Sequence, residues 1–427
     1  MFPDQKYRAL HKMTQDEDGS VRGNAAVALG TAFNHIPDKA QAWRDLHKLI
    51  QDKDGSVRGN ATIALGTAFN HVPDKIQAWQ DLHSLTQDED GSVRGNAAIA
   101  LGTVFNHVPD KIQAWQDLHS LTQDEDGSVR WRAAGTLGMA FNHVPDKRQA
   151  WQDLHKLTLD KYTYVRWRAA AALGWTFSQL PDKTHAWQDL HRLTKDKSSS
   201  VRGRATVALG TAFSHVPDKT QAWQDLHKLT QDENSDVRGR AVVALGTAFS
   251  QVPDKTQTWQ DLIRLTQDKS SSVRGRATVA LGTAFSHVPD KTQAWQDLHK
   301  LTQDENSDVR WSAAATLETV FRHISDKRQA WQDLIRLTQD KNGSVRGNAA
   351  AVLGTAFNHI PDKAQAWQDL HKLIQDKDDS VRGRAANALG KTFSHMPDET
   401  QAWQDLYGLT HDENNDVRFS AANGTIS

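Results

Sequence analysis

The sequence has no cysteine, only four tyrosines and no long run of hydrophobic residues. Without cysteine the chain has no disulfide, no thiolate nucleophile and no cysteine-ligated metal, which fits a reducing compartment. No apolar stretch approaches the roughly 18 residues of a membrane span, so we expect a cytoplasmic protein with no membrane partner. An excess of one charge is also missing, because 51 Lys and Arg residues face 52 Asp and Glu residues. No overall basic field therefore attracts nucleic acid.

One motif fills the sequence instead. The dipeptide Val-Arg recurs every 36 residues, and a Leu, a Phe and a Trp follow the Arg by 7, 11 and 21 residues in all eleven complete repeats. Self-similarity at a fixed period is typical of repeat architectures rather than of several separate domains. The register is marked by Arg22, Arg58, Arg94, Arg130, Arg166, Arg202, Arg238, Arg274, Arg310, Arg346, Arg382 and Arg418.

Each repeat predicts two helices. Pro37 ends the first helix near His35, because proline lacks the N–H that would continue it. Asp38 is expected to cap the second helix, with Gln41 completing a capping-box-like pair. Apolar residues three or four apart define the buried stripes, which are Val21, Ala25, Ala26, Leu29, Phe33 and Ile36 in the first helix and Ala42, Trp43, Leu46 and Leu49 in the second.

The start of the first helix carries its own signal. The fourth residue before the Arg is Asp, Asn or Ser in eleven of twelve copies, and these side chains cap helix N–H groups. Tyr162 is the exception. A single repeat buries about six large apolar side chains at roughly 1.5–3 kcal/mol each, less than its backbone ordering cost of about 1–2 kcal/mol per residue. The repeats must therefore stack on one another.

The repeat resembles the HEAT-like repeat of the phycobilisome-lyase type. The signature of that family is an Asp, then Val-Arg, then Ala-Ala-x-Ala-Leu-Gly, carried here by Asp16, Val21-Arg22 and Ala25–Gly30. The resemblance implies an all-α fold, a right-handed α-α superhelix of about twelve helical hairpins. It also implies a structural ladder of Asp and Arg residues that links adjacent repeats. The ladder pairs would be Asp16 with Arg22, Asp52 with Arg58, Asp88 with Arg94, Asp124 with Arg130 and Asp160 with Arg166.

The ends of the chain hold partial repeats. Residues 1–15 match a second helix only, 16–411 hold eleven complete repeats, and 412–427 supply the start of a first helix. Neither end carries a polar capping repeat. Two explanations stay open: the chain is a piece of a larger multidomain signalling protein, or the two partial repeats meet and close a strongly curved ring.

Catalysis is not expected, because a catalytic site needs singular groups and nearly every polar residue here has many counterparts. Histidines recur at two places in the repeat, but Gln179, Gln251, Ile263, Ile335 and Tyr407 replace them in some copies. We therefore expect helix-surface histidines that cap carbonyls, no metal and no cofactor. The repeated charges at Asp38-Lys39 and Asp45 are expected to form a solvated face. The histidines in question are His35, His71, His107 and His143 in the first helix and His47, His83, His119 and His155 in the second.

Several aromatic residues stand where most copies have a small or polar residue, and two of the recurring arginines lie beside them. Trp, Tyr and Arg are enriched in interface hot spots, although indoles can also fill the space that Gly leaves in other repeats. The candidate partner-binding residues are Trp131, Arg132, Tyr162, Tyr164, Trp167, Arg168, Trp175 and Trp311.

The sequence thus predicts a non-catalytic scaffold or sensor that binds a protein or peptide, with self-association left open. The alternative is nucleic-acid binding through a basic stripe. That stripe would consist of Arg132, Arg168, Arg204, Arg240, Arg276 and Arg384, interrupted by Asn24, Asn60, Asn96 and Asn348.

Overall fold

The computed structural model describes residues 3–288, 290–324, 327–360, 362–393 and 399–426. Across these residues the chain is built of helices and turns, with no strand, and the predicted all-α array of helical hairpins is confirmed. The chain divides into two compact units, Met1–Pro217 (unit 1) and Asp218–Ser427 (unit 2).

The helices of unit 1 are α1 (Pro3–Met13), α2 (Gly19–Ala32), α3 (Lys39–Ile50), α4 (Gly55–Ala68), α5 (Lys75–Leu85), α6 (Gly91–Val104), α7 (Lys111–Leu121), α8 (Gly127–Ala140), α9 (Lys147–Leu157), α10 (Thr163–Thr176), α11 (Lys183–Leu193) and α12 (Ser199–Ala212). Short 3₁₀ turns follow α2, α4, α10 and α12, namely η1 (Phe33–His35), η2 (Phe69–His71), η3 (Phe177–Gln179) and η4 (Phe213–His215).

The helices of unit 2 are α13 (Lys219–Leu229), α14 (Ser235–Ala248), α15 (Lys255–Leu265), α16 (Ser271–Ala284), α17 (Lys291–Leu301), α18 (Ser307–Val320), α19 (Lys327–Thr338), α20 (Gly343–Ala356), α21 (Lys363–Leu373), α22 (Asp379–Thr392), α23 (Glu399–Leu409) and α24 (Asn415–Ile426). Its 3₁₀ turns are η5 (Phe285–His287), η6 (Phe321–His323) and η7 (Phe357–His359).

The first helix of each repeat has an even number and begins at the predicted cap. Asp18 accepts a hydrogen bond from the Ser20 N–H at 2.8 Å, and most other repeats share this bond. Tyr162, Ser198 and Ser270 occupy the same place without a side-chain cap bond. The helix tightens into the 3₁₀ turn at Phe33–His35 in the first repeat, before Pro37, as the sequence predicts.

The second helix of each repeat has an odd number and is capped by Asp38 in the first repeat, which accepts from the Gln41 N–H at 2.9 Å. The reciprocal half of the expected capping box was wrong. The Gln41 side chain points forward and donates to Asp45 Oδ1 at 2.9 Å. A buried carboxylate further along the helix therefore holds this amide.

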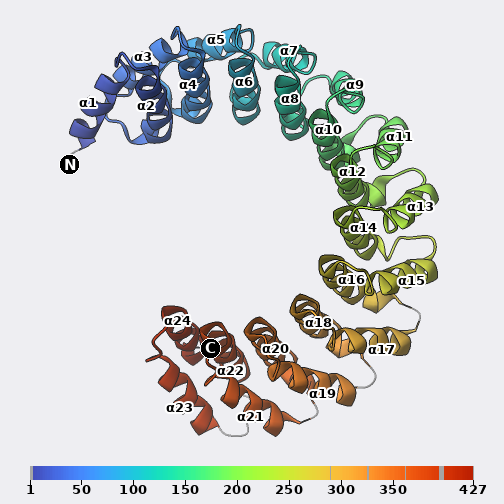
Figure 1. Ribbon diagram of the computed structural model, residues 1–427. Coiled ribbons are helices and arrows are strands. Elements are labelled where there is room, and N and C mark those ends of the chain that lie inside the picture. The colour runs from blue at the N-terminus through green and yellow to red at the C-terminus, as the bar shows by residue number, and fades with distance from the viewer. Residues whose placement is uncertain (1–2, 289, 325–326, 361, 394–398, 427) are drawn as a thin grey trace. The chain divides into compact units, whose positions relative to one another are not determined.

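Two helical layers make up each unit, and the core lies between them. Even-numbered helices form one layer and odd-numbered helices the other (Figure 1). Leu29, Phe33 and Leu46 are fully buried where the layers meet. Neighbouring even-numbered helices lie close together, since a Cβ atom on Gly30 would stand 2.6 Å from the Cα atom of Ala64. Hereafter we call these the even layer and the odd layer.

Candidate functional site

An arginine–aspartate ladder joins consecutive repeats. Arg22 donates from Nε to Asp52 Oδ2 at 2.6 Å and from Nη2 to Asp52 Oδ1 at 2.8 Å. Toward Asp16, six residues earlier, the guanidinium bonds only the backbone oxygen, at 2.9 Å. The carboxylate partner is therefore in the next repeat. An Asp–Arg ladder does link adjacent repeats, as expected, but Arg22 pairs with Asp52 and not with Asp16. The same contact recurs at Arg58–Asp88, Arg94–Asp124, Arg130–Asp160, Arg166–Asp196, Arg238–Asp268, Arg310–Asp340, Arg346–Asp376 and Arg382–Asp412.

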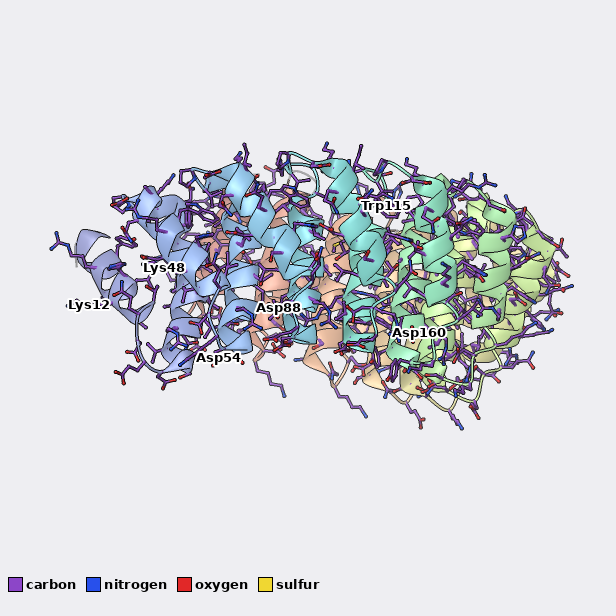
Figure 2. The ribbon with its side chains drawn as sticks, turned by 90° about the horizontal axis from the view of Figure 1, so that it is seen from above. Lys12, Lys48, Asp54, Asp88, Trp115 and Asp160 are labelled. Carbon is purple, nitrogen blue, oxygen red and sulfur yellow. The ribbon has the colours of Figure 1, made fainter. Side chains whose placement is uncertain are left out.

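Each ladder aspartate also holds the turn that follows it. Asp52 Oδ1 accepts the Asp54 N–H at 2.9 Å in addition to the Arg22 bond. The hydrogen bond from Arg22 holds the pKa of Asp52 below its usual range. Figure 2 shows Asp88 and Asp160 along the same edge of unit 1. Because these charges are paired with one another and with the backbone, the ladder serves stacking rather than ligand binding.

A second ladder runs through the odd layer, and the sequence did not predict it. Asp45 is only 2% exposed, so the solvated face expected there was wrong. His11 Nδ1 lies 2.7 Å from Asp45 Oδ2, across the boundary between two repeats. These histidines therefore bind the next repeat rather than cap carbonyls. The further rungs in the odd layer are His47–Asp81, His83–Asp117, His119–Asp153, His155–Asp189, His227–Asp261, His299–Asp333 and His371–Asp405.

One signal in the sequence points to this histidine–aspartate ladder. Asp45 follows Ala42 by three residues and precedes Leu49 by four, which is the spacing of the buried stripe itself. A charged residue at such a position must be paired across the interface. Periodicity therefore marks Asp45 as buried, whereas only the stacking shows that its partner is the histidine of the preceding repeat.

Two rungs of this second ladder are broken. Ile263 and Ile335 replace the histidine, and the aspartates that would pair with it are Asp297 and Asp369. Asp369 is buried, and its Oδ2 atom has no hydrogen-bond partner. Burial raises the pKa of this carboxyl.

The candidate residues around α8, α10 and α12 form stacked cation–π pairs. The Arg168 guanidinium lies 4.7 Å from the Trp131 ring centroid, and that of Arg204 lies 4.2 Å from Trp167. Burial lowers the pKa of Arg168. Trp131 itself is half-buried and packs on a core cluster of Ala134, Leu157, Val165 and Ala169. The two cation–π pairs, Arg168 with Trp131 and Arg204 with Trp167, therefore join neighbouring even-numbered helices.

Tyr162 and Tyr164 form a separate feature at the start of α10. Their rings stack at a centroid distance of 5.3 Å, and both are exposed. They cover Gly127 of the preceding repeat, where an added Cβ atom would lie 2.5 Å from the Tyr164 hydroxyl oxygen. The Lys161 ammonium lies 5.0 Å from the Tyr162 ring centroid. Tyr162 thus exchanges a cap bond for packing on the neighbouring repeat.

Trp175 and Trp311 lie away from these pairs. Trp175 is 52% exposed near the end of α10, about 16 Å along the helix axis from Tyr164. Trp311 belongs to unit 2 and lines a pocket of about 560 Å³ together with Arg276. The candidate residues of unit 1 therefore occupy three places rather than one cluster.

An apolar row crosses the even layer of unit 1, and the sequence analysis missed it. In most repeats an exposed aliphatic residue stands five positions after the ladder arginine. Where that position is Gly135 or Ala171, a large residue stands one helical turn later instead. The row, between 36% and 57% exposed, consists of Val27, Ile63, Ile99, Met139, Trp175 and Val207. Hereafter we call these six residues the apolar row.

The basic stripe is engaged within the protein. Arg240 Nε donates to Asp236 at 2.8 Å, and Arg276 Nη1 lies 3.5 Å from the same carboxylate. Arg132 donates to the Asn96 side-chain oxygen in the preceding repeat. Fewer arginines therefore face solvent unpaired than the sequence pattern suggests.

The described part of the chain holds neither a cluster of metal ligands nor a helix that could span a membrane. No group of three or more His, Asp or Glu side chains there is arranged to hold a metal ion. None of the helices in the same ranges is both long and apolar enough to cross a bilayer.

The repeat geometry agrees with a known family. A family model for HEAT repeats matches residues 79–174, 116–210, 152–246 and 331–424, which together cover more than half of the chain. The protein therefore belongs to the HEAT-repeat family. A model described as sister chromatid cohesion protein PDS5 protein matches residues 223–369. No curated protein matches the sequence.

Several solved structures share the fold. Kap95p, whose binding induces the switch loops of RanGDP to adopt the GTP-bound conformation, matches 97% of this chain at 12% identity and a TM-score of 0.64. The Kap95:Nup1 complex matches 98% at 13% identity and a TM-score of 0.66. Kap121p bound to Pho4p matches 97% at 15% identity and a TM-score of 0.53. This chain spans 60%, 62% and 48% of those chains, and the likeness is one of fold.

Proposed function

We propose that this protein is a non-catalytic interaction scaffold whose even layer in unit 1 binds a protein or peptide. The apolar row carries the proposal, because it places one exposed apolar side chain on each of six successive even-numbered helices, and extended exposed apolar surface marks interaction sites. The similar solenoids Kap95p and Kap121p were solved with RanGDP, Nup1 or Pho4p, which supports a protein as the partner.

The apolar row suits an elongated partner. Packed helices lie about 8–10 Å apart, so successive row residues offer an apolar contact at that interval. The exposed tyrosine pair at the start of α10 adds aromatic rings with polar tips, a combination favoured at interfaces. In this proposal the apolar row is the main contact of an elongated partner, and the tyrosine pair is an additional one.

We also assign the repeats to the phycobilisome-lyase subtype, on the Asp, Val-Arg and Ala-Leu-Gly signature. The lack of cysteine supports a cytoplasmic location. Catalysis has no support in residues that recur in nearly every repeat.

A matched pair of variants tests the proposal. Ile63→Glu and Ile76→Glu both place a charge at an exposed isoleucine, the first in the apolar row and the second on α5 in the odd layer. The tagged chain is used to recover proteins from the native host, with quantification by mass spectrometry. We expect a bound protein that is lost with Ile63→Glu and retained with Ile76→Glu.

A second pair of variants tests the contribution of Trp175, the aromatic residue of the apolar row. Trp175→Ala should weaken capture of the same protein, whereas Trp403→Ala, at an exposed tryptophan in α23, should not. Trp131 is unsuitable for this test because its ring packs on the core. If no captured protein distinguishes either variant from its control, the even layer of unit 1 is not the binding surface.

A further inference from the structure

The broken rung at Ile263 opens a pocket between α15 and α17. Its volume is about 560 Å³, and it lies entirely within unit 2. Trp259, Ile263 and Val288 supply apolar walls, while Asp290, Asp297 and Gln293 supply polar ones. The chain thus places two carboxylates and an indole around one cavity.

Asp297 is the polar centre of this pocket. In the intact rungs the equivalent aspartate receives a histidine Nδ1 atom of the preceding repeat, as Asp333 does from His299 at 2.5 Å. Asp297 faces Ile263 instead. Its Oδ1 atom accepts from Gln293 at 3.2 Å, and Lys300 approaches it at 3.7 Å from a largely exposed position. The side chain remains 13% exposed, so a ligand can reach it.

The indole of Trp259 differs from its counterparts for the same reason. Most other tryptophans of the odd layer lie against the histidine four residues later, as Trp295 does against His299 at 6.3 Å. Trp259 has Ile263 at that place, is half-exposed, and contacts only Phe249, edge-on at 6.2 Å, among the ring contacts of the described chain. One face of the pocket is therefore aromatic.

The cations near the pocket do not fill it. Arg264 lines the rim, but its Nη2 atom donates to Thr230 at 2.7 Å and lies 3.5 Å from Asp261, on the side of the preceding repeat. Asp290 caps α17 through its Oδ1 atom, which accepts from Gln293 N–H at 2.9 Å, and adds a second negative charge. The cavity combines an aromatic wall, an aliphatic wall and a carboxylate.

We propose that this pocket binds the guanidinium group of an arginine side chain presented by a protein partner. A guanidinium stacks on an indole and offers two parallel N–H donors to one carboxylate. Ile263 and Val288 fit the methylene stem that carries the group. In the intact rungs the aspartate is bound instead by the imidazole of the preceding repeat, as Asp333 is by His299. The site lies on the odd layer of unit 2, so it is independent of the apolar row.

The second broken rung serves as the internal control. Asp369 also has no histidine partner in the preceding repeat, but it is only 3% exposed. A ligand therefore cannot reach it as it reaches Asp297. Replacing Ile335 by His completes that rung without touching the pocket between α15 and α17.

The test uses N-acetyl-arginine amide as the probe and the whole 427-residue chain as the receptor. Binding is followed by the indole N–H resonance of Trp259, identified as the signal absent from Trp259→Phe. We expect saturable binding, at least ten-fold weaker for N-acetyl-citrulline amide, which has the same shape without the charge. Ile263→His should abolish binding, because it puts into the pocket the ring that other repeats already hold. Ile335→His should bind the probe as the natural protein does.

Asp297→Asn gives an independent arm, with at least a ten-fold loss of affinity at unchanged helicity. Free arginine should bind no more tightly than the capped amide, since the pocket is expected to contact the guanidinium and its methylene stem, which the two compounds share. Tighter binding of free arginine would make the amino acid the ligand and overturn the assignment to a protein partner. Equal binding of the citrulline compound, or full binding by Ile263→His, would overturn the site.

Discussion

Completing a broken rung of the histidine–aspartate ladder should stabilise unit 2. In Ile335→His the new imidazole would face Asp369, whose Oδ2 atom has no hydrogen-bond partner. His299 already makes this contact with Asp333 one repeat earlier in the odd layer, at 2.5 Å. Arg336 is compatible with the change, because Arg192 follows His191 in unit 1.

The magnitude follows from two opposing effects. A hydrogen bond to a charged group contributes about 1.5–3 kcal/mol, and a half-buried isoleucine loses about 1 kcal/mol of apolar burial when replaced. The net gain is about 0.5–2 kcal/mol, a factor of roughly 2–30 in the equilibrium between closed and open segments.

Hydrogen exchange of the whole 427-residue chain is the appropriate assay, since a repeat array opens locally rather than in one step. Protection should rise in α19 and α21 and stay constant in α3 and α5. A double-mutant cycle with Asp369→Asn supplies the control, because the histidine should bring no gain once its acceptor has lost its charge. Equal gains in both backgrounds, or no gain at all, would refute the reasoning.

Asp369 of the natural protein, which has no histidine partner, should also make the stability of unit 2 depend on pH. Burial raises the pKa of Asp369 in the folded protein, so the folded state holds the proton more tightly than the unfolded state does. The contribution of this group is therefore complete below its unfolded pKa of about 3.9 and is lost as the pH rises through the folded value. Asp369→Asn should remove this loss.

Two further predictions concern the contacts between repeats. The hydrogen bond from Arg22 lowers the pKa of Asp52, so the ionised Asp52 stabilises the packing of α2 on α4 at neutral pH. This contribution is lost as the pH falls below about 4. Hydrogen exchange at acid pH should show the loss, and Arg22→Gln should make the protection of these helices less dependent on pH. Gly30→Ala should destabilise unit 1 by about 1–3 kcal/mol, because its Cβ would stand 2.6 Å from the Cα atom of Ala64. Gly408→Ala is the control, since no neighbouring atom lies within 4 Å of its Cβ position. Thermal unfolding should show that this variant gains about 0.5–1 kcal/mol of stability. An equal loss of stability in both variants would contradict this account of even-layer packing.

The sequence alone determined the period, the two helices of each repeat and their caps. These features depend on local preferences, such as the cap at Asp38 and the stop at Pro37, and the copies repeat them without interruption. The buried stripe through Leu29 and Phe33 follows from spacing alone. Stacking followed as well, because a single repeat buries too little apolar surface to stay folded.

Only the tertiary structure decided which residues meet across repeats. The sequence paired Arg22 with Asp16, whereas the stacking offset brings it to Asp52. Asp45 looked solvated until the preceding repeat placed His11 against it. The aromatic candidates looked like one cluster, but their positions along α10 separate Trp175 from Tyr164. Helical periodicity tells which face of a helix a side chain occupies, while the neighbour's offset decides what that face touches.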